Sequence, residues 1–122
     1  MSDILIKNAK IINEGKIFKS DILIKGDFIS DIAHNIPFES QYKLIDASNK
    51  VLIPGVIDDQ VHFREPGLTH KATINSESKA AIAGGVTSFI EMPNTIPQTT
   101  TINDLDNKFE IAKNNSYANY SF

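Results

Sequence analysis

Residues 56–90, which read VIDDQVHFREPGLTHKATINSESKAAIAGGVTSFI, decide the fold of this chain. The stretch begins with a strand-like run over residues 56–63 and continues, after a polar loop, into a helical segment from about Ile74 to Ala83. Gly84 and Gly85 follow where a helix would end in a left-handed cap. Residues 86–90 are β-branched and aromatic, which is typical of a strand. The order strand, helix, strand predicts a crossover unit of a parallel sheet.

The same order continues after residue 90. Pro93 and Asn94 indicate a loop, and Thr101 with Asp104 three residues later resembles a helix capping box with Asp in place of Glu or Gln. An apolar helical stripe and an alternating strand follow, made of Ile102, Leu105, Phe109 and Ala112 and then of Ala118, Tyr120 and Phe122. A parallel sheet of three strands leaves an open edge and an uncovered face. We therefore expect an α/β chain that is a fragment of a larger fold.

Residues 1–53 are β-rich. Residues 4–6 and 11–12 are short apolar runs, and Asn13-Glu14-Gly15 separates them from residues 16–18 as a hairpin loop would. This spacing favours an antiparallel meander. We expect residues 34–43 to form a surface connection and residues 43–45 and 51–53 each to form a short strand. We predict two parts, a β-rich segment over residues 1–53 and the start of an α/β series over residues 54–122.

The composition is that of a folded domain and excludes several classes of protein. Of the 122 residues, 41% are hydrophobic and 22% are charged, and the net charge of −3 leaves no basic stripe for nucleic acid. No apolar run reaches the roughly 20 residues of a membrane span, and the start Met1-Ser2-Asp3 is unlike a secretory signal. Cysteine is absent, which excludes disulfides and thiolate-bound metal. We expect a cytoplasmic protein with no nucleic-acid or membrane partner.

Four polar side chains are expected on one face of the first α/β strand. Residues two apart on a strand share a face, which groups Asp58, Gln60, His62 and Arg64. Barrels and open α/β sheets place their sites at the carboxyl ends of such strands. His62 suits a metal such as Zn²⁺, Asp58 suits the orientation of a metal ligand, and the fork of Arg64 suits a carboxylate. A solvated strand face with ordinary salt bridges is the alternative that this pattern leaves open.

Residues 54–67, PGVIDDQVHFREPG, resemble the signature of class I dihydroorotases, in which a P-G-hydrophobic-hydrophobic-D-x-H-x-H strand precedes x-R-E-P-G. The resemblance continues through Thr69-His70-Lys71, through residues 80–87 (AAIAGGVT), and into residues 91–95 (EMPNT) with Pro97. In the related allantoinases the stretch after the histidines is similar to N-E-P-G, and in the hydantoinases R-E-P-G is lacking. Arg64 together with Asn94 therefore favours dihydroorotase among the cyclic amidases.

The resemblance implies a TIM-type (β/α)8 barrel of a metallo-hydrolase. Residues 54–122 would be its first two βα units and part of the third strand, and residues 1–53 would belong to a flanking β-sandwich. It also implies that Arg64 and Asn94 hold the carboxylate of the substrate, with His62 at both substrate and metal. The carboxylated lysine, two further histidines and the catalytic aspartate of the family lie on later strands. No catalytic residue is therefore expected within this chain, and the isolated chain is expected to be inactive.

Gln60 departs from the family pattern, which has a histidine at this position. Glutamine is a poor, neutral zinc ligand. Three interpretations stay open: one of two metals is lost or weakened, a single metal is held by His62 and ligands outside this chain, or the protein has given up catalysis. We expect one or two zinc ions, with His62 and the weaker donor Gln60 as ligands. Asp58 is expected to orient a ligand without binding the metal itself. Glu65 is expected to brace the loop rather than to attack substrate.

On this resemblance, the main hypothesis is a dihydroorotase. Such an enzyme is a metal-dependent cyclic amidohydrolase that interconverts N-carbamoyl-L-aspartate and dihydroorotate in pyrimidine biosynthesis, and we expect a homodimer. Gln60 raises an alternative, a non-catalytic subunit that scaffolds aspartate transcarbamoylase. A third hypothesis is another cyclic amidase, such as allantoinase or dihydropyrimidinase. Arg64 counts against it, because those substrates carry no equivalent carboxylate.

Overall fold

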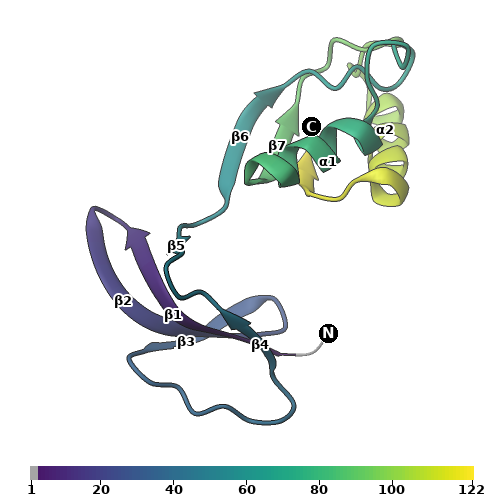
Figure 1. Ribbon diagram of the computed structural model, residues 1–122. Helices are drawn as coiled ribbons and strands as arrows, with labels where there is room; N and C mark the ends of the chain where they lie inside the picture. Colours follow the sequence, from purple (N-terminus) through teal and green to yellow (C-terminus); the bar gives the residue numbers. More distant parts are fainter. Residues whose placement is uncertain (1–2) are drawn as a thin grey trace. The chain divides into compact units, whose positions relative to one another are not determined.

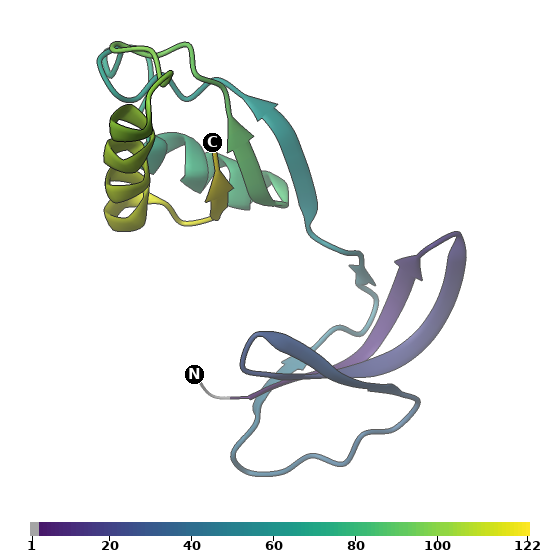
Figure 2. The same cartoon turned by 180° about the vertical axis from the view of Figure 1, so that it is seen from behind.

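The computed structural model describes residues 3–122 and divides the chain into two compact units, Met1–Pro54 and Gly55–Phe122. Each unit has its own sheet and its own apolar core. Figures 1 and 2 show the elements of both units from opposite sides. None of the helices within residues 3–122 is long and apolar enough to cross a membrane.

The first unit is a five-stranded sheet with the order β3-β2-β1-β4, in which β5 also pairs with β1. Its strands are β1 (Ile4–Asn13), β2 (Lys16–Lys25), β3 (Phe28–Ala33), β4 (Lys43–Asp46) and β5 (Val51–Leu52). The first three form the antiparallel meander that the sequence predicts, whereas β4 and β5 run parallel to β1. Its buried apolar residues are Leu5, Leu23, Ile36 and Tyr42 in one cluster and Ala9, Ile11, Ile22 and Ala47 in another.

The apolar runs at residues 4–6 and 11–12 belong to one strand, β1. A bulge interrupts the strand, because the register with β2 shifts between Ile6 and Ala9. Asn8 lies in the bulge with φ of 64°, a left-handed conformation that Asn tolerates better than most residues. The polar residues between the two runs therefore mark an irregularity within a strand and not its end.

A buried carboxylate, Asp21 on β2, holds this bulge in place. It accepts hydrogen bonds from the backbone N–H groups of Asn8 at 2.8 Å and Ile36 at 3.1 Å. Lys7 Nζ forms an ion pair with Oδ2 of Asp21 at 3.2 Å. Burial raises the pKa of Asp21, but the two N–H donors and the Lys7 ammonium outweigh burial and hold the pKa below its ordinary value of 3.8. The ionised form of Asp21 therefore stabilises the first unit.

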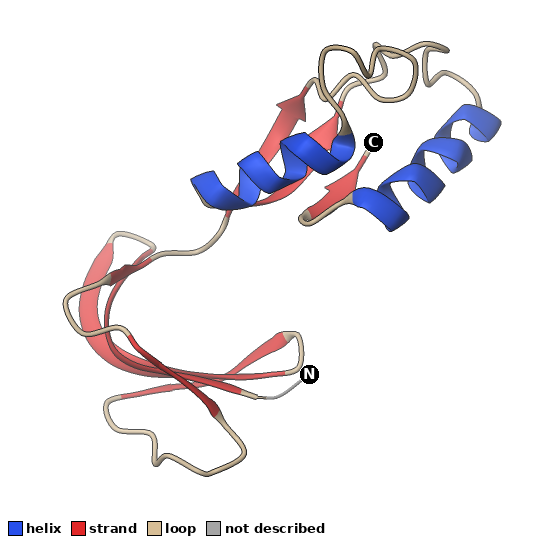
Figure 3. Ribbon diagram, turned by 45° about the vertical axis from the view of Figure 1, so that its right-hand side comes forward, coloured by secondary structure: helices blue, strands red, loops and turns tan. Residues whose placement is uncertain are grey.

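The second unit alternates strands and helices around a parallel sheet. Its elements are β6 (Val56–Val61), α1 (Ile74–Gly84), β7 (Val86–Glu91), α2 (Ile102–Asn115) and β8 (Asn119–Ser121). The strands lie in the order β6-β7-β8 and all pairs are parallel, which confirms the predicted crossover connections. The two crossover helices pack against each other, and Figure 3 shows both beside the strands of the sheet. The predicted mixed α/β character of the chain is confirmed.

The helix ends follow local signals, with one difference from the prediction. Gly85 ends α1 with φ of 91°, as expected, and Thr73 begins it with a full capping box to Ser76. Thr101 caps α2 by accepting the N–H of Asp104. The carboxylate of Asp104 accepts from the Thr101 hydroxyl at 2.7 Å. It makes no hydrogen bond to the Thr101 backbone N–H, since Asp is one methylene shorter than Glu, so the predicted box is half formed.

The core of the second unit contains Phe63, Ile74, Phe89, Ala112 and Ala118. The rings of Phe63 and Phe89 lie 4.5 Å apart between centroids. The predicted apolar stripe of α2 is wrong in part. Ile102 is 79% exposed, while the buried residues of the helix are Lys108 and Ala112. A lysine in this core requires a partner, and that partner lies beside the candidate site.

Candidate functional site

The candidate site is built on two loops that leave the carboxyl ends of β6 and β7. These strands are neighbours in the sheet, so the loops begin side by side. The Met92 N–H donates to the Val61 carbonyl at 3.0 Å where the strands end. Farther out, the Ile96 N–H donates to the Pro66 carbonyl at 3.1 Å. These two bonds tie the loop with His62 and Arg64 to the loop with Asn94.

Strand β6 is shorter and less regular than the sequence predicts. The prediction extends it to Phe63, but it ends at Val61. Asp58 pairs with Phe89 and Val61 pairs with Glu91, so three steps on β6 face two on β7. This bulge breaks strict alternation, and the simple rule that placed Asp58, Gln60, His62 and Arg64 on one face does not hold across it.

His62 and Asn94 meet across the two loops. Nδ1 of the His62 ring lies 3.1 Å from Oδ1 of Asn94. An amide oxygen accepts, so the bond requires a proton on Nδ1. In the neutral ring this leaves Nε2 as the unprotonated nitrogen, which is the form that binds a metal. The same bond leaves the amide NH₂ of Asn94 as a donor for a ligand.

Arg64 lies directly after the strand end in an unusual backbone conformation. Its φ is 72°, in the left-handed region that non-glycine residues seldom occupy. Its backbone N–H donates to Oε1 of Glu91 at 3.0 Å. The side chain is half-buried, and within residues 3–122 no hydrogen bond or ion pair engages its guanidinium. All five guanidinium N–H donors are therefore available to a ligand.

Glu91 and Lys108 form a buried ion pair beside these loops. Both side chains are 0% exposed. Lys108 Nζ also donates to the Met92 carbonyl at 3.1 Å and lies 4.8 Å from the centre of the Phe122 ring. This pair was not predicted from the sequence. The available signal was the position of Lys108, three residues after Leu105 and four before Ala112, on the apolar side of the helix.

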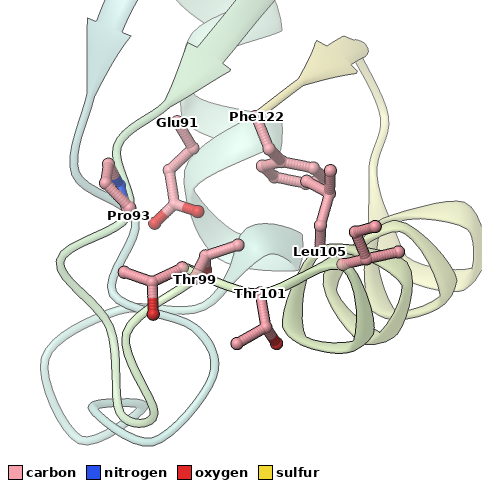
Figure 4. A pocket seen from close by; sticks show the side chains of 8 residues that line it. Glu91, Pro93, Thr99, Thr101, Leu105 and Phe122 are labelled. Atoms are coloured by element: carbon pink, nitrogen blue, oxygen red, sulfur yellow. The ribbon is translucent and has the colours of Figure 1, made fainter.

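A pocket of about 370 Å³ lies next to this pair. Figure 4 shows the Glu91 carboxylate directed toward Thr99, with Leu105 and Phe122 across from it. The lining of this pocket does not include His62, Arg64 or Asn94. It is therefore separate from the residues that the sequence predicts for substrate.

Glu65 braces the loop after β6, as predicted. Its Oε2 accepts the backbone N–H of Ile74 at 2.8 Å, at the first residue of α1. A carboxylate is favourable at a helix N-terminus, because it accepts an otherwise unpaired N–H and meets the positive end of the helix dipole. Glu65 is thus occupied in holding the loop that carries Arg64.

The donors for a metal are few in this chain. Gln60 and His62 are exposed, and Asp58 is half-buried with its Oδ1 accepting the backbone N–H of Gln60 at 3.1 Å. Across residues 3–122, no three side chains of His, Asp or Glu are grouped so that they could hold an ion. One imidazole with one neutral amide is too small a donor set for zinc, which takes three or four protein ligands. The residues of this chain do not by themselves form a metal site.

Comparison with solved structures places the fold among the amidohydrolases. An L-hydantoinase (dihydropyrimidinase) from Arthrobacter aurescens matches with a TM-score of 0.91 and 31% identity, over 98% of this chain and 27% of that one. A D-hydantoinase (dihydropyrimidinase) from Thermus sp. matches with a TM-score of 0.83 and 34% identity, over 98% of this chain and 26% of that one.

Sequence comparison gives the family. Residues 49–117 match the model of the family described as Dihydro-orotase-like. A dihydroorotase of Carboxydothermus hydrogenoformans is 50% identical over 95 residues, which cover 76% of this chain and 22% of the relative. One of Methanosphaera stadtmanae is 40% identical over 122 residues, covering 98% of this chain and 28% of the relative. The chain belongs to the dihydro-orotase-like family and spans about a quarter of the length of these relatives.

Proposed function

We propose that the protein containing this chain is a dihydroorotase that interconverts N-carbamoyl-L-aspartate and dihydroorotate in pyrimidine biosynthesis. The observation that carries this proposal is the guanidinium of Arg64, which is half-buried and has no partner within residues 3–122, on a loop bonded to the loop of Asn94. Membership of the dihydro-orotase-like family supports the same substrate. The hydantoinase neighbours support a hydrolase of cyclic amides more generally.

In this proposal Arg64 and Asn94 hold the substrate carboxylate. The planar fork of Arg64 matches the two carboxylate oxygens with two parallel N–H donors. The amide NH₂ of Asn94, left free by the bond from His62, adds a further donor. Held in this way, the ring amide is fixed in one orientation for hydrolysis. Water then adds across the amide bond: the C–N bond breaks, the hydroxyl joins the carbonyl carbon and a proton goes to the nitrogen.

The family implies a metal, and we propose zinc. This chain would supply Nε2 of His62 and, as a weaker ligand, the amide oxygen of Gln60. Asp58 would orient a ligand without binding the metal itself. The remaining ligands and the catalytic groups would lie in the part of the enzyme outside this chain. A zinc ion would supply Lewis-acid polarisation of the amide carbonyl. His62 would present the unprotonated Nε2 to the metal, because its hydrogen bond to Asn94 fixes the tautomer of the imidazole.

The larger architecture is part of the same proposal. Residues 54–122 would be the first two βα units and part of the third strand of a TIM-type (β/α)8 barrel, and residues 1–53 would belong to a flanking β-sandwich. The consecutive parallel order β6-β7-β8 supports a barrel, in which the site lies at the carboxyl ends of the strands. A homodimer in the cytoplasm, with aspartate transcarbamoylase as a further partner, completes the proposal.

The experiment is turnover of dihydroorotate by the full-length enzyme, with the product identified as N-carbamoyl-aspartate by mass spectrometry. Allantoin and dihydrouracil serve as competing substrates in the same assay. Preferred turnover of dihydroorotate is the expected result. Preference for either competitor would refute the assignment, and no turnover of any of the three would favour the non-catalytic subunit that Gln60 suggests.

The metal content tests the role of Gln60 separately. A histidine is a better zinc ligand than a glutamine. The Gln60→His variant is therefore expected to bind more zinc per chain than the parent, measured by elemental analysis of the full-length protein after dialysis. An unchanged metal content would show that Gln60 lies outside the coordination shell.

A further inference from the structure

The buried ion pair of Glu91 and Lys108 is not explained by binding of substrate. Neither side chain is exposed. Glu91 lines the pocket of about 370 Å³, whose lining does not include Arg64 or Asn94. Taking two charges out of water is costly, and well-packed apolar residues are often as stabilising in their place. The positions of the pair suggest a more specific role than stability. Glu91 is the last residue of β7, and Lys108 reaches that strand end from α2.

The two oxygens of Glu91 face different partners. Among residues 3–122, Oε2 has Lys108 as its sole partner. Oε1 accepts the backbone N–H of Arg64 at 3.0 Å. The ammonium of Lys108 therefore fixes a carboxylate whose other oxygen holds the backbone of the arginine. A carboxylate acceptor gives a stronger bond to N–H than a neutral acceptor does.

Arg64 needs such a restraint. At φ of 72° its backbone is in a conformation that is unfavourable for a side chain with a Cβ and that persists only when its surroundings impose it. A relaxed Arg64 backbone would swing the long side chain away from its present direction. Lys108 also binds the Met92 carbonyl, and the N–H of Met92 binds Val61. The pair is thus bonded to the starts of both loops that carry the site.

We propose that Glu91 is a positioning residue for Arg64, with Lys108 as the counter-ion that orients its carboxylate. The inference rests on the proposed function in one respect, that Arg64 binds the carboxylate of the substrate. Glu91 touches no substrate in this scheme. It sets the backbone of Arg64 so that the guanidinium fork meets the carboxylate.

Two double variants of the full-length enzyme isolate this role. Glu91→Gln with Lys108→Met removes both charges and keeps an amide oxygen that can accept the Arg64 N–H. Glu91→Met with Lys108→Met also removes both charges but leaves no acceptor. Both variants avoid an unpaired buried charge, and the acceptor for the Arg64 N–H is present in the first and absent from the second. Each is measured for KM and kcat on dihydroorotate and for hydrogen–deuterium exchange of a peptide covering residues 62–68.

The variant without an acceptor is expected to show a KM about tenfold above that of the Gln variant, the factor that one lost hydrogen bond corresponds to. Its kcat is expected to be unchanged, because binding of a remote carboxylate is lost equally from ground and transition states. Its peptide is expected to exchange faster. Equal KM values in the two double variants would overturn the inference. If the wild-type enzyme does not turn over dihydroorotate, the proposed function fails instead, and equal exchange in the two variants would then be the result that overturns the inference.

Discussion

Replacement of Lys108 by methionine should destabilise the protein strongly. The Lys108 ammonium has three partners: the Glu91 carboxylate, the Met92 carbonyl at 3.1 Å and the Phe122 ring at 4.8 Å. Methionine fills a similar volume but leaves the Glu91 carboxylate buried without a cation. Removing one member of a buried pair costs about 3–5 kcal/mol. Adding Glu91→Gln removes the stranded charge, so the double variant should recover most of this loss.

The assay is urea unfolding of the full-length protein, followed by circular dichroism. Lys113→Met is the matched control, since it makes the same change on the same helix at an exposed ion pair with Glu110, 3.3 Å apart. Exposed pairs contribute little, so the control should unfold with the parent. If Lys108→Met is no less stable than Lys113→Met, then the Glu91 carboxylate does not need the Lys108 ammonium for stability.

Two further predictions concern other parts of the chain. Because the folded pKa of Asp21 lies below its ordinary value of 3.8, the stability it contributes is fully present above that value and is lost as pH falls through the folded pKa. In urea unfolding between pH 7 and pH 3, the free energy of unfolding should therefore fall more steeply with decreasing pH in the parent than in Asp21→Asn. Equal dependence on pH in the two proteins would contradict this. Gly67→Ala should lower the thermal midpoint, since its φ is 84° and an added Cβ would lie 1.9 Å from the Ile96 carbonyl oxygen. The control is Gly26→Ala, because Gly26 has φ of 58° and no atom lies within 4 Å of an added Cβ. The control should lower the thermal midpoint less, and equal decreases would exclude the clash as the cause.

The parallel order of the second unit was predictable because its signals are local. Gly85 ends α1 where the sequence places a left-handed cap, and Thr101 begins α2. The short connections from α1 to β7 and from α2 to β8, together with clear helix caps, leave few ways to pair β6, β7 and β8. The antiparallel meander at the start of the chain was predictable for the same reason.

The features that the sequence did not reveal depend on residues far apart in the chain. In the bulge of β1 the Asn8 N–H donates to Asp21 on β2, and no local rule for residues 4–13 includes that acceptor. Lys108 appears as a polar interruption of an apolar stripe, because its counter-ion comes from the end of β7. The left-handed backbone of Arg64 likewise depends on Glu91. Sequence motifs predicted the side chains of the candidate site, whereas the groups that hydrogen-bond to them are visible only in the tertiary structure.

The proposed function depends on the guanidinium of Arg64 holding the carboxylate of the substrate. The most direct measurement compares kcat/KM for dihydroorotate and for dihydrouracil, which lacks the carboxylate, in the full-length enzyme and its Arg64→Met variant. Losing one partner of a hydrogen-bonded charge pair corresponds to a factor of about 30 or more. We expect that loss of kcat/KM for dihydroorotate and little change for dihydrouracil. An equal loss on both substrates, or none on dihydroorotate, would contradict it.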